Sequence, residues 1–171
     1  RFCVLGGISM FIDISDLIDN PGAKVKREGI CDFTEWQSEM TPIVNHPVTV
    51  KATAYNDSGD IMLELSVDFI LTLECDRCTE EFEQAHSEIF SHKLFDSESE
   101  LGDIIKPDAN GRLELNPIVW DDMMFCVPQR RLCKENCKGL CINCGGNLNN
   151  GSCGCDNPKP VLFEDEDISG D

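Results

Sequence analysis

The sequence has few basic residues: 14 lysines and arginines stand against 32 aspartates and glutamates in a chain of 171 residues. The formal net charge is -18 at pH 7. Because a field of this sign repels phosphate, any contact with nucleic acid needs a local basic patch. By charge alone, a basic protein is the easier partner.

Long apolar runs are also lacking. No run approaches the roughly 20 residues that span a bilayer, which excludes an integral membrane protein. Residues 1–15 resemble a signal peptide only weakly, because Asp13 interrupts the apolar stretch and no small-residue cleavage site follows. Gly6 and Gly7 can be encoded by a ribosome-binding sequence upstream of Met10. We therefore expect a cytoplasmic protein that starts at Met10, with residues 1–9 as an upstream extension.

Motifs of enzyme chemistry are missing as well. The sequence contains no phosphate-binding loop, no dinucleotide fingerprint and no nucleophile motif, and its three histidines lie far apart. Asp121 and Asp122 are neighbours, so on a helix their side chains point about 100° apart and cannot act as a facing acid and base. We expect a protein that is not an enzyme.

What the sequence does contain is a long period-two alternation. Residues 48–56 alternate, 56–60 supply turn residues, and 61–73 place every second apolar side chain on one face. Residues 82–95 read as a return strand. The 41% apolar content supports a folded core, and the three strands predict an antiparallel meander.

A short strand and a helix are predicted over residues 112–127, after an acidic loop-like segment. Asn116 would be the N-cap and Pro117 the first helical residue, with Asp121 and Asp122 near the N-terminal end of the helix dipole and Pro128 ending the helix.

Together these patterns predict an α+β fold: an antiparallel β-meander sheet with a few short helices and a C-terminal cysteine-rich zinc knuckle. The predicted divisions are an α+β core over 10–128, a cysteine-rich zinc-binding segment over 129–157 and an acidic disordered tail over 158–171.

The chain has eleven cysteines, an odd number that suits a disulfide framework poorly in the absence of a signal peptide. Cys3, Cys31 and Cys126 stand alone in apolar surroundings and are expected to be small buried hydrophobes. The other eight occur in "CDRC" at residues 75–78 and in "LCKENCKGLCINCGGNLNNGSCGC" at residues 132–155.

One Zn²⁺ is predicted within the second stretch. A C-x-x-C turn brings two sulfurs together, and Gly145 permits the positive φ that turns the chain away. We assign Cys141, Cys144, Cys153 and Cys155 to this site. A closed site of four cysteines is expected to be structural rather than catalytic.

Four cysteines remain, and they equal one more tetrahedral site. A second Zn²⁺ would join Cys75 and Cys78 to Cys133 and Cys137. The alternative is a single site that takes its ligands from the six local cysteines and leaves "CDRC" apart. Ferredoxin spacings are absent. A redox role for "CDRC" is weak, because the surrounding carboxylates should hold its thiols protonated.

A group of basic residues surrounds the cysteine-rich stretch: Arg130, Arg131, Lys134 and Lys138. One interpretation is a solvated face whose cations offset the anionic thiolates. The other is a patch that contacts RNA phosphates or a partner.

The combination of "LTLECDRCTEEFE" with "VPQRRLCKENCKGLCINCGGNLNNGSCGC" resembles the YceD family, bacterial proteins linked to accumulation of large-subunit ribosomal RNA. Cys75, Arg77 and Cys78 match the C-x-R-C element of the family. The six cysteines from Cys133 to Cys155 match its cysteine-rich end.

The resemblance implies ribosome biogenesis, and family members are often encoded beside a small, basic, zinc-containing large-subunit ribosomal protein. The first hypothesis is therefore a non-enzymatic factor that promotes accumulation of 23S rRNA by binding a basic ribosomal protein, the 23S rRNA precursor, or both. The second is a metal-handling or thiol-redox protein that uses its surplus cysteines.

Overall fold

The computed structural model describes residues 9–37, 42, 44–94 and 105–155. The predictions for Cys3, for the acidic segment over 96–104 and for the tail over 158–171 fall outside the described residues, and the start at Met10 stays a prediction. Contacts divide the chain into two compact units. The core unit comprises residues 1–73 and 81–129, and the cysteine unit comprises residues 74–80 and 130–171.

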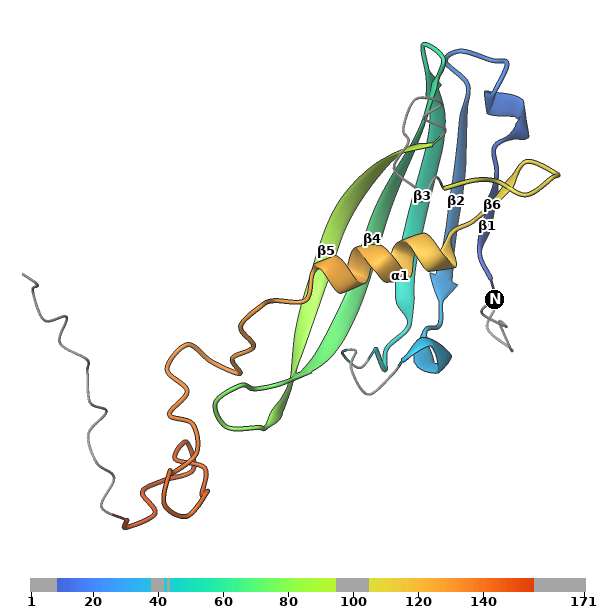
Figure 1. The fold of residues 1–171 in the computed structure, drawn as a ribbon. Helices are drawn as coiled ribbons and strands as arrows, with labels where there is room; N and C mark the ends of the chain where they lie inside the picture. Colours follow the sequence, from blue (N-terminus) through green and yellow to red (C-terminus); the bar gives the residue numbers. More distant parts are fainter. Residues whose placement is uncertain (1–8, 38–41, 43, 95–104, 156–171) are drawn as a thin grey trace, which may run out of the picture. The chain divides into compact units, whose positions relative to one another are not determined.

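The core unit is built on a four-stranded sheet in the order β2-β3-β4-β5 (Figure 1). Its strands are β2 (Lys24–Cys31), β3 (Val48–Asp57), β4 (Asp60–Glu74) and β5 (Glu81–Leu94). β3 pairs antiparallel with both β2 and β4. The predicted hairpin and return strand are present, and β2 is a fourth strand that was not predicted.

The long alternation produces the buried face of this sheet. Because successive side chains in a strand point to opposite faces, one residue in two along β3 and β4 can enter the core. The residues buried in this way are Val48, Val50, Ala52, Ala54, Ile61, Leu63, Leu65, Val67, Phe69, Leu71 and Leu73. The predicted apolar face is therefore confirmed over the whole length of β4.

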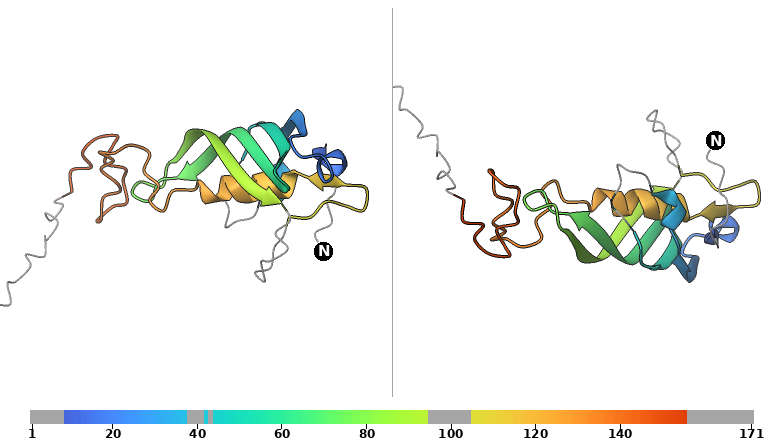
Figure 2. Two further views of the ribbon diagram at one scale, coloured as in Figure 1. Left: turned by 90° about the horizontal axis from the view of Figure 1, so that it is seen from above. Right: turned by 90° about the horizontal axis from the view of Figure 1, so that it is seen from below.

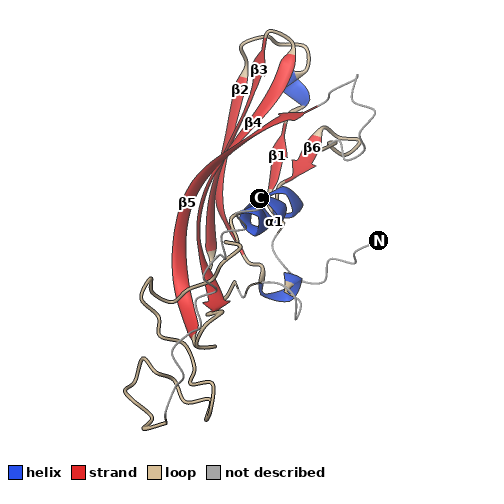
Figure 3. Ribbon diagram, turned by 60° about the vertical axis from the view of Figure 1, so that its left-hand side comes forward, coloured by secondary structure: helices blue, strands red, loops and turns tan. Residues whose placement is uncertain are grey.

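A single helix, α1 (Asn116–Phe125), lies across this face of the sheet (Figure 3). The two views along the sheet show α1 against one face only (Figure 2). Val119 and Met123 enter the same core, and Trp120 lies 5.5 Å from the Phe33 ring. A small sheet of β1 (Phe11–Asp13) and β6 (Arg112–Glu114) and two 3-10 turns, Ser15–Leu17 and Thr34–Trp36, complete the unit. The α+β class with an antiparallel sheet is confirmed.

The start of α1 differs from the prediction. Asn116 is the first residue of the helix rather than its cap, and the N-cap residue Leu115 makes no capping side-chain hydrogen bond. The Asn116 side chain is buried, and its Oδ1 accepts a hydrogen bond of 2.8 Å from the Met10 N–H. Asn116 therefore satisfies a buried donor more than 100 residues away in sequence, which outweighs its local preference for the cap.

The paired aspartates of α1 are also placed differently from the prediction, because no acidic residue lies in the first turn. Asp122 is buried, and its Oδ2 lies 2.8 Å from Nε2 of His92 on β5. Asp121 is exposed. A buried carboxylate needs a partner, and for Asp122 this partner is a histidine rather than the helix dipole.

Candidate metal centres

The turn between β4 and β5 carries the "CDRC" cysteines. The Cys75 N–H donates to the Glu80 carbonyl and the Thr79 N–H donates to the Cys75 carbonyl, both at 2.9 Å. Thr79 has a φ of 59°, a left-handed conformation that closes the turn. These bonds hold Cys75 and Cys78 in one tight turn with both side chains buried.

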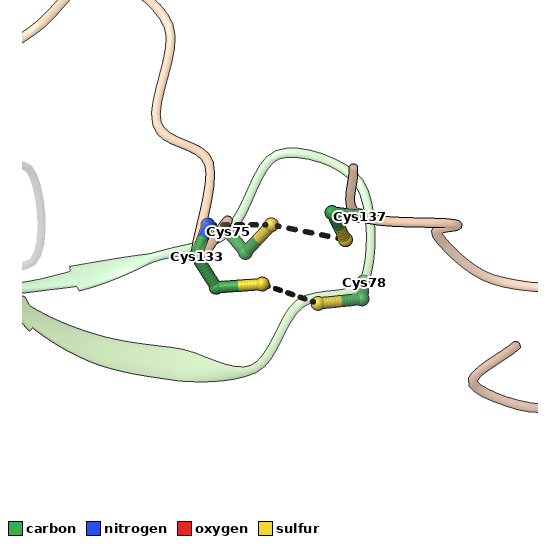
Figure 4. Close-up of side chains that lie close together, drawn as sticks. All are labelled: Cys75, Cys78, Cys133 and Cys137. Atoms are coloured by element: carbon green, nitrogen blue, oxygen red, sulfur yellow. Dashed lines mark hydrogen bonds between the residues drawn. The ribbon is translucent and has the colours of Figure 1, made fainter. Parts of the chain in front are cut away.

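Two cysteines from the C-terminal segment meet this turn (Figure 4). Cys75 Sγ lies 3.8 Å from Cys137 Sγ, and Cys78 Sγ lies 3.7 Å from Cys133 Sγ. All four sulfurs lie within 4.8 Å of one another. We call these four residues the turn tetrad.

The sulfur spacing distinguishes a metal site from disulfides. A disulfide brings its sulfurs to about 2.05 Å. Four sulfurs at the roughly 2.3 Å zinc–sulfur bond length of a tetrahedral site lie about 3.8 Å apart. The distances of 3.7 and 3.8 Å in the turn tetrad match the second value. The residues present thus fit a four-coordinate ion of this size.

A second group, the knuckle tetrad, consists of Cys141, Cys144, Cys153 and Cys155, whose sulfurs also lie within 4.8 Å of one another. The Gly145 N–H donates to the Cys141 carbonyl at 2.8 Å, and Gly145 has a φ of 71°. This is the turn that the C-x-x-C-G pattern predicts. Each tetrad could hold a metal ion, and the grouping is the one proposed from the sequence for two sites.

The two tetrads differ in their exposure to solvent. In the turn tetrad, Cys75, Cys78 and Cys137 have exposed fractions of 0, 2 and 3%. In the knuckle tetrad only Cys141 is buried, and Cys144 and Cys153 are exposed. Reagents in solution therefore reach the knuckle sulfurs more easily.

The pKa of the Cys75 thiol is lowered, which favours its ionised form. Burial opposes its charge, but backbone N–H groups of Cys133, Arg77 and Cys78 donate toward its sulfur and together lower its pKa to about 6. The Cys133 N–H lies 3.4 Å from that sulfur. The expectation that nearby carboxylates keep both "CDRC" thiols protonated is therefore wrong for Cys75, whereas the pKa of Cys78 is raised.

Cys141 holds the corresponding position in the knuckle tetrad. Backbone N–H groups of Cys144 and Asn143 donate toward its sulfur and lower its pKa to about 6. The Asn143 N–H lies 3.4 Å from Cys141 Sγ. Each tetrad thus contains at least one thiol whose ionised form is stabilised by backbone donors, and metal ligands of this kind bind as thiolates.

An ion pair of the cysteine unit joins the "CDRC" turn to the C-terminal segment. The Arg131 N–H donates to Asp76 Oδ2 at 2.7 Å, and the Arg131 guanidinium lies 3.1 Å from Asp76 Oδ1. Arg131 of the predicted basic patch therefore has a structural partner. Arg130, Lys134 and Lys138 are exposed.

Hydrogen bonds of Arg77 also join the "CDRC" turn to the C-terminal segment within the same unit. Arg77 Nη1 donates to the Cys137 carbonyl at 2.8 Å, and its own carbonyl accepts from the Leu140 N–H at 3.0 Å. The arginine of the C-x-R-C element thus fixes the segment that leads from the turn tetrad to the knuckle tetrad.

Asn149 and Gly139 support the sites but were not identified from the sequence. Asn149 Nδ2 donates to Cys137 Sγ at 3.3 Å. Gly139 has a φ of 73°, and a Cβ built there would lie 2.9 Å from the Arg77 carbonyl oxygen. The only available signal was the turn-forming "NLNNGS" composition, which does not show that an asparagine reaches the other site.

The sequence of the chain matches a known protein family. Residues 63–165 match the family described as large ribosomal RNA subunit accumulation protein YceD, and this range includes both tetrads. The chain belongs to the YceD family.

A curated YceD relative is the "Large ribosomal RNA subunit accumulation protein YCED homolog 1, chloroplastic" of Zea mays, which is 30% identical. The alignment covers 64% of this chain and 48% of the maize protein, so the chain spans about half the length of that relative. No solved structure matches.

Among the described cysteines, Cys31 and Cys126 belong to neither tetrad. Cys31 is buried, which raises its pKa to about 11, and burial also raises the pKa of Cys126. Within the described residues, the two tetrads are the groups of three or more histidine, cysteine or acidic side chains that could hold a metal. None of the helices in the described part of the chain has the length and apolar character needed to cross a membrane.

We expect Gly139→Ala to weaken the cysteine unit more than Gly145→Ala does. Both glycines have a φ near 70°, so either alanine carries the left-handed strain of about 1–2 kcal/mol. Only at Gly139 does the added Cβ also meet a backbone oxygen at 2.9 Å, whereas nothing lies within 4 Å at Gly145. Chelator competition on the two variants measures the difference, and equal zinc affinities would contradict it.

Proposed function

We propose that this YceD-family protein is a non-enzymatic ribosome biogenesis factor that promotes accumulation of large-subunit 23S rRNA in the cytoplasm. The observation that carries the proposal is the family match over residues 63–165, which includes most of β4, all of β5 and α1, and both tetrads. The curated maize relative bears the same functional name.

Two Zn²⁺ ions are the proposed occupants of the tetrads. Zn²⁺ bound by four thiolates has no open position for water or substrate, and such ions act as cross-links of the fold. The turn tetrad would join residues 74–80 to the segment after Arg130, and the knuckle tetrad would close residues 141–155. A purely structural role of both ions supports the proposal that the protein is not an enzyme.

The proposed contact for a basic ribosomal protein is a hollow of about 500 Å³ in the core unit. Three carboxylates line it, from Asp121, Asp122 and Glu114, against the basic side chains of Lys106 and His92, and His92 pairs with Asp122. Apolar Ile118 and Phe125 also line it, and Phe125 is 86% exposed. A lysine or arginine can lay its aliphatic stem on such apolar surface while its charged end faces the carboxylates. The net charge of -18 would attract the same partner from a distance.

A direct contact with the 23S rRNA precursor is proposed for Arg130, Lys134 and Lys138. These three side chains are exposed in the cysteine unit. Phosphate contacts of this kind would weaken as salt rises.

Affinity capture from cells, followed by identification of the bound proteins and RNA, tests the proposal. We expect the wild-type protein to recover a basic large-subunit ribosomal protein and precursor rRNA. An Asp121→Asn, Phe125→Ala double variant should recover several-fold less of the protein, and Glu64→Ala, on the exposed side of β4, should not change the recovery. Recovery of metabolic enzymes without any ribosomal component would reject the ribosomal function.

The exposed sulfurs of Cys144 and Cys153 favour a second candidate, a metal-handling or thiol-redox protein. Substituting Cys75 and Cys78 with serine separates the two. Retained association with ribosomal components together with a lost zinc or redox response would favour the second candidate.

A further inference from the structure

The loop between Cys144 and Cys153 reaches the turn tetrad although both of its ends belong to the knuckle tetrad. Asn149, in the middle of this loop, donates its Nδ2–H to Cys137 Sγ at 3.3 Å. Cys137 is in turn 3.8 Å from Cys75 Sγ.

The Asn149 side chain is held from several sides. Its Oδ1 accepts from the Lys138 N–H at 3.0 Å, and its Nδ2 also donates to Asn147 Oδ1 at 2.8 Å. The Leu148 N–H donates to the Gly139 carbonyl at 2.9 Å. The loop is therefore fastened to residues 138–139, directly after Cys137, and the amide is aimed at the sulfur.

The two ends of the loop are themselves members of the knuckle tetrad. Cys144 and Cys153 are exposed, and their sulfurs come together with those of Cys141 and Cys155. An ion bound there would fix both ends. Without one, the two ends lose this cross-link, and the loop that carries Asn149 is held through its hydrogen bonds to residues 138–139, which fix the Asn149 amide less firmly.

We propose that Asn149 couples the two metal sites, so that occupancy of the exposed knuckle tetrad strengthens metal binding at the buried turn tetrad. The inference rests on the proposed binding of zinc by both tetrads. An N–H donor draws charge from Cys137 Sγ and so lowers the repulsion among four thiolates around one ion. Because coupling is reciprocal, an ion in the turn tetrad also strengthens binding at the knuckle tetrad.

The proposal predicts an order of metal loss. A chelator or thiol reagent reaches the exposed knuckle cysteines first, and loss of their ion loosens the loop. The Asn149 amide is then fixed less firmly, and the turn tetrad holds its ion less tightly. The knuckle tetrad thus acts as the exchangeable site that sets how firmly the buried site is closed.

Zinc competition with a chromogenic chelator tests the coupling on the full chain. Asn149→Ala is expected to weaken the turn site about 10-fold, at the low end of the 10 to 100-fold seen when a group behind a metal ligand is removed. Asn149→Asp keeps the acceptor for the Lys138 N–H but replaces the donor with an anion, so it should weaken the site at least as much. Asn150→Ala, an exposed neighbour in the same loop, is the matched control and should leave the affinity unchanged.

A double-mutant cycle decides whether the effect passes through the knuckle. A Cys153→Ser, Cys155→Ser variant removes the second site and should weaken the turn site by a similar factor. Adding Asn149→Ala to it should then change little, because the loop is already loosened. If Asn149→Ala still costs about 10-fold in that background, Asn149 acts on Cys137 alone and the coupling is rejected.

Cadmium-113 NMR gives a readout independent of affinity, since each tetrad yields its own resonance. Asn149→Ala should shift the turn resonance and broaden the knuckle resonance, and Asn150→Ala should shift neither. Two unchanged resonances would overturn the coupling but leave the structural zinc sites intact. Failure of the wild-type chain to bind any Zn²⁺ or Cd²⁺ would instead reject the proposed metal sites.

Discussion

A Cys75→Ser variant is expected to bind one Zn²⁺ per chain instead of two. Cys75 is fully buried, and its sulfur receives the backbone donors that lower its pKa to about 6. A serine hydroxyl does not ionise near neutral pH and is a poor ligand for zinc, so three thiolates would remain without a closed site. Native mass spectrometry measures the loss directly. Two-dimensional NMR should show that the amide signals of residues 74–80 and 130–138 lose their dispersion, while those of the core unit persist.

Two further variants serve as the comparison and the control for this result. Cys153→Ser should also lose one ion but disturb fewer amide signals, because Cys153 is exposed. Cys126→Ser should keep both ions, since Cys126 belongs to neither tetrad. If Cys75→Ser retains two ions, the turn tetrad is not a metal site.

A Leu65→Ala substitution in the core unit is expected to lower the free energy of unfolding by about 2–5 kcal/mol, the range found when buried leucines are cut to alanine. Leu65 is fully buried in the middle of β4, opposite Ala52 of β3. Urea denaturation followed by tryptophan fluorescence measures the change, because Trp36 and Trp120 pack against this core.

The neighbouring residue provides the control for that measurement. Glu64→Ala changes an exposed side chain on the opposite face of β4 and should alter stability by less than about 0.5 kcal/mol. The zinc count should stay at two in both variants. Equal effects of the two substitutions would contradict the assignment of the buried face.

The sheet could be predicted as far as its side chains alternate. β3 and β4 bury one face along their whole length, so polarity along the sequence repeats every two residues. β2 was not predicted from this periodicity because it is an outer strand with mostly exposed side chains and four charged residues among eight. A strand that buries little leaves no periodic signal.

Long-range partners explain the errors around α1. Asn116 suits an N-cap and Asp122 suits a helix dipole when only the neighbouring sequence is considered. In the fold, Asn116 pairs with the Met10 N–H and Asp122 with the His92 ring, because both side chains are buried and need a polar partner. No local pattern identifies a partner that lies 106 residues away, as Met10 does.

The grouping of eight cysteines into two tetrads was one of two arrangements that counting left open, since a thiolate site for zinc takes four ligands. The hydrogen-bond donors around the sulfurs could not be predicted from the sequence. The pKa of Cys75 depends on backbone groups whose direction is fixed only by the turn, and the Asn149 contact depends on a loop folding back over 12 residues. Composition suggested the opposite charge state for Cys75.

The turn tetrad and the knuckle tetrad differ in the sequence separation of their cysteines. Cys78 and Cys133 are 55 residues apart, and residues 81–129 between them fold as part of the core unit. Bringing the ends of an unfolded segment of that length together costs loop-closure entropy. Once residues 81–129 have folded, this cost no longer opposes metal binding at the turn tetrad. The knuckle tetrad closes within residues 141–155 and needs no such help. Metal capture at the turn tetrad therefore reports that the core unit has folded, whereas capture at the knuckle tetrad does not.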